Sequence, residues 1–326
     1  MNAAADDAWM ASPSVPPVAP GCARPLWSVM IPTFHCAGFL RQTLESVLTQ
    51  DPGPDAMQIE VVDDCSTRDD PEAVVREVGG GRVRFHRKPE NGGATRNFNT
   101  CIERSTGHLV HILHGDDLVM PGFYRRLAAA AAAHANRGLI ACRAMCIDEG
   151  GIPTGITARV PSLEAGADDV RDFLYHVPLR TPCVVVRRSF YEEHGGFLPG
   201  LAHTADWEMW IRVVGEAGGV VLPDVLAQYR EFAASDTSRL RRTADNLRDV
   251  ERIFGLFVRR YPEFDWKPAK ERLALESAGQ TAFFRHYGDA EAHAANRDYF
   301  RSITPMPRRV TMFLRSLATR IVDRVL

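Results

Sequence analysis

Short, mainly apolar runs alternate with amphipathic segments in the first part of the chain. The runs at residues 28–31, 59–62 and 83–85 each end at a proline or a polar residue, which is typical of strands buried in a sheet. Between them, the leucine and valine residues of 38–50 fall on one helical face, and a second helix is expected over 71–78. This alternation predicts a parallel sheet whose strands are joined by crossover helices.

The same pattern continues through the middle of the chain and brings two acidic residues to the end of a fourth strand. A turn at 91–93 precedes a helix, which Gly107 is expected to end. Residues 109–113 form the fourth strand, which leads into Asp116 and Asp117. Further elements are expected as an alanine-rich helix with Pro121 in its first turn, strands at 139–145 and 183–186, and a helix that contains Trp207, Trp210, Ile211 and Val214.

The two ends of the chain differ in composition from this α/β region. Residues 1–24 are rich in alanine, proline and serine and are expected to form a disordered tail, with Asp6 and Asp7 where a signal peptide carries basic residues. The last part of the chain is arginine-rich and helical in pattern. We therefore predict an α/β domain over 25–240 and a helical region over 241–326.

Composition narrows the class of protein. Among 326 residues, 45% are hydrophobic and 25% charged, as in ordinary globular proteins, and the formal net charge of −2 argues against a nucleic-acid partner. The chain contains no run of about 18 apolar residues that would span a membrane. The seven cysteines are odd in number and irregular in spacing, which favours reduced thiols and a cytoplasmic protein.

Polar residues follow three of the predicted strands at the edge where open α/β sheets bind ligands. Neighbouring carboxylates at such an edge repel each other, and a hard divalent cation such as Mg²⁺ or Mn²⁺ would relieve that repulsion. The glycine-rich phosphate loops of dinucleotide-binding and P-loop enzymes are absent from the sequence. A diphosphate bridged by a metal therefore remains as the way to hold a nucleotide here. The residues are Pro32, Thr33 and Phe34 after the first strand, Asp63 and Asp64 after the second, and Asp116 and Asp117 after the fourth.

Four blocks in order along residues 26–230 resemble the inverting glycosyltransferases of family 2. The blocks are WSVMIPTFHCAGFLRQTLESVLTQ, IEVVDDCSTRDD, NGGATRNFNTCIERSTGHLVHILHGDDLVMP and HTADWEMWIRV. The resemblance implies an α/β fold of the GT-A type, a Rossmann-like and mostly parallel sheet that binds a nucleotide-diphospho-sugar, here with a C-terminal helical extension. It also implies glycosyltransferase activity that depends on a divalent cation, Mn²⁺ or Mg²⁺.

The resemblance further implies how the nucleotide would be held. Pro32, Thr33 and Phe34 match the first nucleotide-binding loop, in which the phenyl ring of Phe34 would stack on the base. Asp64 matches the carboxylate that accepts a hydrogen bond from the N3–H of uracil. Finally, Arg96 and Asn97 lie in the block on the diphosphate side of the site.

The remaining matches concern the metal and the reaction. Asp117 matches the direct metal ligand, and Asp116 lies nearer the ribose or the sugar. Asp206 matches the catalytic base. Two residues depart from the family pattern: His114 stands at the first acid of Asp-x-Asp-Asp, and Phe232 stands where relatives often have a histidine.

Each of these positions also has a structural interpretation. The dipole of a following helix could favour Asp116 and Asp117 at its N-terminus, and Asp64 could belong to a turn. Asp206 could cap a helix while its second carboxylate oxygen stays free. We expect His111 to be a core residue, because strand positions three apart point to opposite faces and it cannot share a metal with a residue at 114.

We therefore predict that a sugar is moved from a nucleoside diphosphate to a hydroxyl of a glycan or lipid-linked acceptor, in surface polysaccharide biosynthesis. UDP is the expected nucleotide, with dTDP as an alternative that has the same N3–H, and Arg180 and Thr181 are expected on the acceptor side. Alternatives are a non-catalytic binder of nucleotide sugars or glycans on the same fold and a nucleotidyltransferase. The C-terminal segment has an apolar face that either packs on the domain or contacts the inner face of the membrane, and its residues are Val310, Phe313, Leu314, Leu317 and Ile321.

Overall fold

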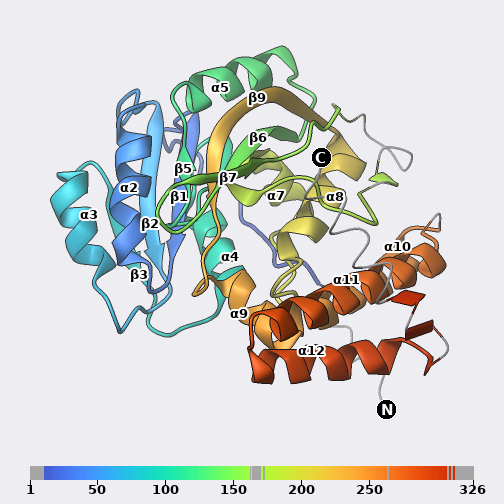
Figure 1. Ribbon diagram of the computed structural model, residues 1–326. Helices are drawn as coiled ribbons and strands as arrows, with labels where there is room; N and C mark the ends of the chain where they lie inside the picture. The colour runs from blue at the N-terminus through green and yellow to red at the C-terminus, as the bar shows by residue number, and fades with distance from the viewer. Residues whose placement is uncertain are drawn as a thin grey trace. The chain divides into compact units, whose positions relative to one another are not determined.

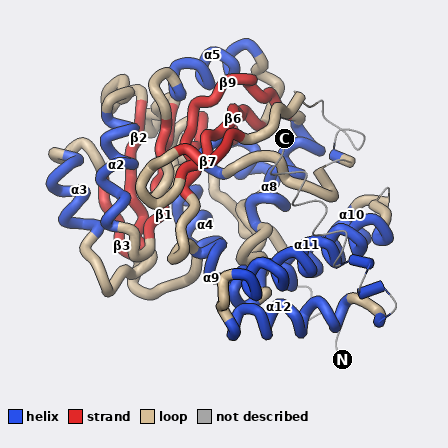
Figure 2. The backbone as a smooth tube through the Cα atoms, viewed as in Figure 1, coloured by secondary structure: helices blue, strands red, loops and turns tan. Residues whose placement is uncertain are grey.

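The computed structural model forms two compact units, and strands are found only in the first unit among the described residues (Figure 2). The first unit comprises described residues of Met1–Gly200 and Ala205–Glu231, and the second those of Leu201–Thr204 and Phe232–Leu326. The structure describes residues 11–161, 163, 170–171, 173–262, 264–306, 308–309 and 311–312.

The first unit is built on one sheet of mixed direction. Its strand order is β3-β2-β1-β4-β8-β6-β9-β5, with β7 beside β6. The strands are β1 (Trp27–Thr33), β2 (Met57–Asp63), β3 (Arg84–Arg87), β4 (Leu109–Ile112), β5 (Leu118–Val119), β6 (Leu139–Ile147), β7 (Pro153–Ile156), β8 (Val184–Arg187) and β9 (Gly219–Arg230). The helical segments of this unit are α2 (Ala37–Leu48), α3 (Pro71–Gly79), α4 (Ala94–Arg104), α5 (Phe123–Ala133), η2 (Thr181–Cys183), α7 (Arg188–His194) and α8 (Ala205–Ala217).

Strands β3, β2, β1 and β4 are parallel, as the alternating pattern predicted. Every residue of β1 and β2 is buried; β1 is mainly apolar, whereas β2 buries Gln58 and Glu60 among its apolar residues. Thr33 pairs with Asp63 at the last position of the β1–β2 register, so the polar residues after both strands emerge at the same edge. The local sequence also sets both ends of the crossover helix α3. Asp70 caps its beginning by accepting a hydrogen bond from the Ala73 amide, and Gly80 ends it in the left-handed conformation.

The rest of the sheet has antiparallel neighbours. Strand β8 is antiparallel to both β4 and β6, while β9 runs parallel to β6. Helix α5 lies along β6 and β9 at the upper border of the sheet in Figure 1. The sequence pattern did not predict β9, because Pro223 interrupts it. The register of β9 against β6 shifts between Ala141 and Arg143, so β9 follows the sheet with an irregularity at its proline.

Two predicted helix boundaries are wrong. Helix α4 ends before Ser105, whose backbone is extended, and Gly107 instead lies so close to β1 that a Cβ atom there would be 2.5 Å from the carbonyl carbon of Trp27. Helix α5 begins at Phe123 after Gly122, whose φ is 90°, rather than with Pro121 in its first turn. Gly107 is needed for close packing against β1, and Gly122 is needed for a turn. Neither requirement can be seen in the periodicity of the sequence.

Part of the expected disordered tail is ordered against the first unit. Val15 is 4% exposed, and the carbonyls of Pro13 and Pro16 accept hydrogen bonds from the Gly196 amide and the Arg188 guanidinium. These contacts depend on residues far along the chain, which the composition of the tail could not reveal.

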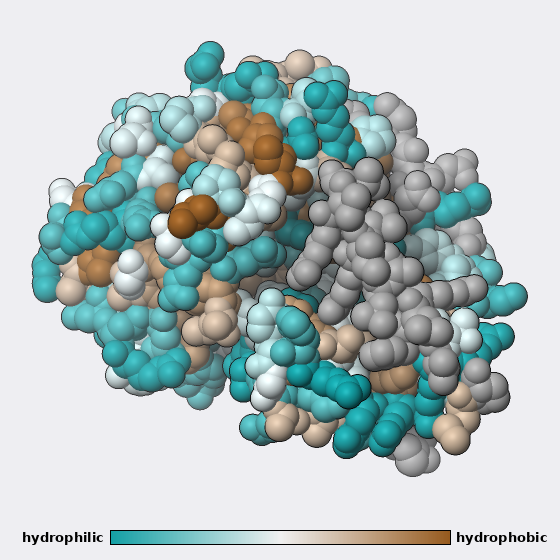
Figure 3. Space-filling model, viewed as in Figure 1, coloured by the Kyte–Doolittle hydropathy of each residue, from teal (hydrophilic) through white to brown (hydrophobic). Residues whose placement is uncertain are grey.

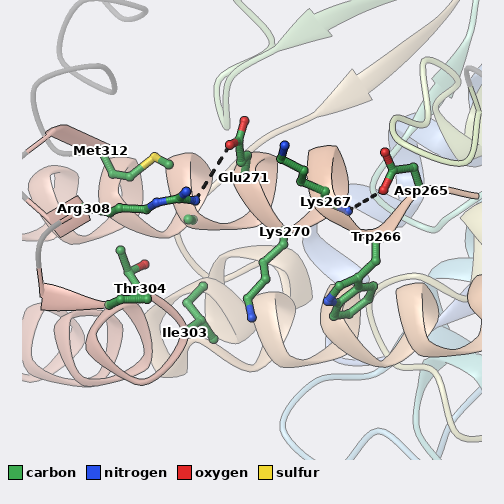
Figure 4. Close-up of a pocket in the computed structure, with 11 residues that line it drawn as sticks. Asp265, Trp266, Lys267, Lys270, Glu271, Ile303, Thr304, Arg308 and Met312 are labelled. Carbon is green, nitrogen blue, oxygen red and sulfur yellow. Dashed lines mark hydrogen bonds and ion pairs between the residues drawn. The ribbon is translucent and has the colours of Figure 1, made fainter.

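The second unit is helical, as the sequence indicated. A small core cluster joins Ala274, Ala278, Phe300 and Met312, and a cavity of about 420 Å³ lies beside it (Figure 4). Its helices are α9 (Asp236–Thr243), α10 (Asp245–Arg260), α11 (Trp266–His286) and α12 (Ala290–Ile303).

The apolar face predicted for the C-terminal segment lies outside the described residues, since Val310 and residues 313–326 are not described. Among the residues that are described, no helix combines the length and apolar character needed to cross a bilayer.

Candidate active site

The motif that follows β4 is pressed against the loop that follows β1. Backbone pairing continues past β4, with the Leu113 amide donating to Met30 O and the Gly115 amide donating to Pro32 O at 3.1 Å. A Cβ atom at Gly115 would lie 2.7 Å from Thr33 Cγ2 and 2.8 Å from Cys36 Sγ. Glycine is therefore required for this close approach, which brings the acidic motif to the first predicted nucleotide loop.

Asp117 is buried with only part of its hydrogen-bonding capacity used. The carboxylate is 1% exposed, and its Oδ1 accepts from the Arg230 amide at 2.9 Å. Among the described residues, Oδ2 has no hydrogen-bond partner. Thr43 Oγ1 donates to the Asp117 carbonyl at 2.8 Å, which fixes the backbone of the motif. A buried carboxylate oxygen without a donor is costly, and a cation would satisfy it.

His114, Asp116 and Asp117 form a cluster in which one donor atom from each lies within 4.8 Å of the others. His114 Nδ1 is 3.7 Å from Asp117 Oδ2, and the imidazole stacks on Phe98 with a centroid distance of 5.1 Å. Burial raises the pKa of both aspartates, and the charge of Asp116 raises the pKa of Asp117 further. The donor set and the carboxylate oxygen without a hydrogen-bond partner among the described residues both fit a divalent cation.

Arg230 supports this motif, and sequence reasoning missed its role. The side chain is nearly buried, its Nε donates to Asp116 O at 2.9 Å, and its guanidinium lies 4.7 Å from the ring centroid of Phe39. Its Nη2 donates to Gln42 Oε1 at 2.7 Å. The sequence offered little signal for this role, because Gln228 interrupts the apolar residues before Arg230 and the segment was not recognised as a strand.

Arg230 also holds the hairpin between β6 and β7. Its Nη1 donates to Glu149 O at 2.9 Å and to Asp148 O at 3.3 Å. This hairpin exposes two large apolar side chains, Ile152 and Ile156, and Figure 3 shows brown atoms where it projects. One buried guanidinium therefore links the acidic motif to a hairpin with an apolar surface.

The loop after β1 has the features expected of a nucleotide-binding segment. The Phe34 side chain is 45% exposed, so its ring is accessible to a planar ligand. His35 and Cys65, in the loops after β1 and β2, both have positive φ angles, which are uncommon for residues other than glycine. The Ser66 hydroxyl joins the two loops by accepting from the His35 amide at 2.9 Å.

Asp64 is buried and its carboxylate is already occupied. It accepts from the amides of Gly92 and Gly93, at 3.0 and 2.8 Å, and from the Lys88 ammonium. These bonds hold the turn that precedes α4. The structure therefore explains Asp64 as an organiser of this turn, and a contact with a base would have to be made in addition to, or in place of, one of these donors.

The two predicted residues of α4 lie in different surroundings. Arg96 is exposed, whereas Asn97 is buried and its Nδ2 donates to Val62 O at 2.9 Å. Asn97 Oδ1 has no hydrogen-bond partner among the residues described. His111 is a core residue, as expected: burial lowers its pKa to about 3, and its Nε2 lies 3.0 Å from Pro182 O.

Asp206 lies within the first turn of α8, which begins at Ala205, rather than before the helix as a cap. Its Oδ2 accepts from Thr181 Oγ1 at 3.1 Å, and its Oδ1 accepts from the Trp207 amide at 2.8 Å. Both oxygens are thereby oriented, and each keeps a lone pair for a further donor.

Arg180 contacts a neighbour of Arg230 and precedes the residue that binds Asp206. Its guanidinium carbon is 5.5 Å from the ring centroid of Tyr229, which precedes Arg230, and the next residue, Thr181, contacts Asp206. Within the part of the chain that is described, the buried Nε of Arg180 has no hydrogen-bond partner. The structure thus connects the candidate base and the candidate metal site through an arginine that can bind an anion.

The sequence profile described as "Glycosyl transferase family 2" matches residues 28–195. A curated relative, "Uncharacterized protein MT1568" of Mycobacterium tuberculosis (strain CDC 1551 / Oshkosh), is 28% identical over 248 residues, which are 72% of this chain and 76% of the relative.

Two of the solved structures with the same fold hold nucleotide sugars. The structure of S. aureus TarS 1-349 in complex with UDP-GlcNAc has a TM-score of 0.59 at 17% identity, covering 89% of this chain and 79% of that one. The chain spans 54% of the longer TarS structure. The mannosyltransferase PcManGT from Pyrobaculum calidifontis, in complex with GDP-Man and Mn²⁺, has a TM-score of 0.53 at 19% identity, covering 96% and 90%. These likenesses confirm the predicted GT-A fold.

Proposed function

The chain belongs to glycosyltransferase family 2, and on this premise we propose that it transfers a sugar, with inversion, from a nucleoside diphosphate to a hydroxyl of a glycan or lipid-linked acceptor. The observation that carries this proposal is the buried Asp117 carboxylate, one oxygen of which has no donor among the described residues, at the edge of the sheet where the loops after β1 and β4 meet. We place the reaction in surface polysaccharide biosynthesis.

Asp117 would hold a divalent cation, with Asp116 beside it on the side of the ribose or the sugar. When bound, this cation would neutralise charge on the departing diphosphate. The likeness to a mannosyltransferase crystallised with GDP-Man and Mn²⁺ supports a cation of this class.

Asp206 would act as the general base that removes the proton of the acceptor hydroxyl as it attacks. Thr181 and the Trp207 amide orient the carboxylate, and a base positioned in this way typically contributes about 10²–10⁴-fold to the rate. Arg180, which precedes Thr181 in the chain and lies over the Tyr229 ring, would bind the diphosphate or an anionic group of the acceptor through its guanidinium.

The nucleotide would lie at the carboxyl end of β1, where Pro32 and Thr33 are the last, buried strand residues, with its base against the exposed phenyl ring of Phe34. Asp64 would recognise the N3–H of uracil by giving up one of its present donors. A UDP-sugar is therefore the first donor to test, and dTDP- and GDP-sugars are the matched comparisons, since the neighbouring structures hold UDP-GlcNAc or GDP-Man.

Replacement of Asp206 by asparagine separates binding from chemistry. We expect Asp206→Asn to bind UDP with unchanged affinity and to lose sugar transfer by at least about 10²-fold, because the amide cannot accept the proton. A calorimetric titration with UDP and Mn²⁺ and a transfer assay provide the two readouts. Normal transfer by the variant would show that Asp206 is not the base.

The matched control is Asp224→Asn. Asp224 is a partly exposed aspartate of β9 that pairs only with Arg126 among the described residues. This variant should retain both UDP binding and transfer, so a loss in it would indicate a general effect of the substitution.

A further inference from the structure

The metal motif contains a nitrogen donor where the pattern of the family has a carboxylate. His114 Nδ1 lies 3.7 Å from Asp117 Oδ2. That is too long for a hydrogen bond. It is a natural separation for two donors of one cation, because donors at about 2.1 Å from a metal lie at most about 4.2 Å apart.

The surroundings of His114 hold the ring in place. The imidazole is stacked on Phe98, with an interplanar angle of 12°. The backbone closes on itself, since the Asp117 amide donates to His114 O at 3.1 Å. Stacking on Phe98 therefore restrains the orientation of the ring whose Nδ1 lies 3.7 Å from Asp117 Oδ2.

The nature of the donor has a consequence for the choice of metal. Mg²⁺ prefers oxygen ligands only, whereas imidazole nitrogen suits Mn²⁺ less well than it suits Co²⁺ or Zn²⁺ but better than it suits Mg²⁺. Asp116, Asp117 and His114 together supply two oxygens and one nitrogen.

The geometry points to His114 as a direct metal ligand that shifts the cation preference of this transferase away from Mg²⁺ and toward Mn²⁺ and Co²⁺. This inference rests on the proposed function, in that the site is the one that would hold the donor diphosphate. It adds a residue and a metal preference that the acidic motif alone does not specify.

The experiment compares the wild-type protein with His114→Asp, His114→Ala and an exposed control, His134→Asp, at the end of α5. Each is titrated with Mn²⁺, Co²⁺ and Mg²⁺ in the presence of UDP, and the Mn²⁺ complexes are examined by electron spin echo spectroscopy. Thermal melts without metal establish that each variant is folded.

We expect wild type and His134→Asp to bind Mn²⁺ and Co²⁺ at least about ten-fold more tightly than Mg²⁺ and to show nitrogen modulation of the Mn²⁺ echo. His114→Asp should lose the nitrogen modulation of the Mn²⁺ echo. It should also reduce the difference in affinity between Mn²⁺ and Mg²⁺, because aspartate makes the site all-oxygen. His114→Ala should lose about ten-fold in Mn²⁺ affinity. Unchanged modulation and unchanged Mn²⁺ affinity in both His114 variants would overturn the inference.

Failure of this inference and failure of the proposed function give different results. If the nitrogen signal depends on His114 but no nucleotide sugar is consumed, the metal assignment stands and the transfer proposal fails. If sugar is transferred while His114 leaves the metal preference unchanged, the transfer proposal stands and His114 is not a ligand.

Discussion

Loss of the Arg230 guanidinium should destabilise the first unit and loosen the metal motif together. In Arg230→Ala, the carbonyls of Asp116, Asp148 and Glu149 and the side chain of Gln42 all lose a donor. An unsatisfied buried acceptor costs about 1–3 kcal/mol. Glu149 is exposed, so water replaces part of the hydrogen bonding that its carbonyl loses. We therefore expect a decrease of about 3–5 kcal/mol in the free energy of unfolding.

Urea denaturation measures this change, and hydrogen exchange of peptides from β6 and β9 assigns it to the first unit. Arg126→Ala is the control, because Arg126 is exposed and its pair with Asp224 should contribute less than about 1 kcal/mol. Arg230→Lys should be intermediate, since one ammonium cannot reach acceptors on three segments. If Arg230→Ala is no less stable than Arg126→Ala, the guanidinium does not organise the motif and the reasoning is wrong.

Three further outcomes follow from the site. Gly115→Ala should lower stability by about 1–3 kcal/mol in a thermal melt because its Cβ meets the loop after β1, whereas Gly38→Ala, in open space within α2, should be neutral. Burial raises the pKa of Asp116 and Asp117 in the folded protein. When a chelator removes the metal, their contribution to the free energy of unfolding should therefore be present at low pH and be lost as the pH rises above about 4. Melting temperatures with and without Mn²⁺ measure this, and Asp117→Asn should flatten the chelator profile. Thr181→Val should lower kcat by about ten-fold with unchanged UDP affinity, because the proposed base loses its orienting donor; equal losses in kcat and affinity would contradict a positioning role.

Most of the parallel half of the sheet could be predicted from the sequence because its signals are local. Strand β1 is buried along its whole length and is mainly apolar, β2 has apolar residues at 57, 59, 61 and 62, and α3 begins with a proline after a capping aspartate. The polar residues after these strands could be placed at one edge because parallel strands end together.

What could not be predicted depends on contacts between distant segments. Strand β9 contains Pro223, and only its pairing with β6 makes it a strand. The Asp117 carboxylate is fixed by the amide of Arg230, far along the chain, and the sequence gives no sign of that bond. The ion pair between the Lys88 ammonium and the Asp64 carboxylate likewise depends on how the turn before α4 folds back.

The central claim is that Asp117 binds the cation that holds the donor diphosphate. A crystal grown with UDP and Mn²⁺, with diffraction recorded at the manganese absorption edge, tests it most directly. We expect an anomalous peak within bonding distance of the Asp117 carboxylate and of the diphosphate, with the base against Phe34. The claim would be contradicted if UDP were bound at the carboxyl edge of the sheet with no manganese peak at Asp117, or if the manganese peak were bonded to other residues.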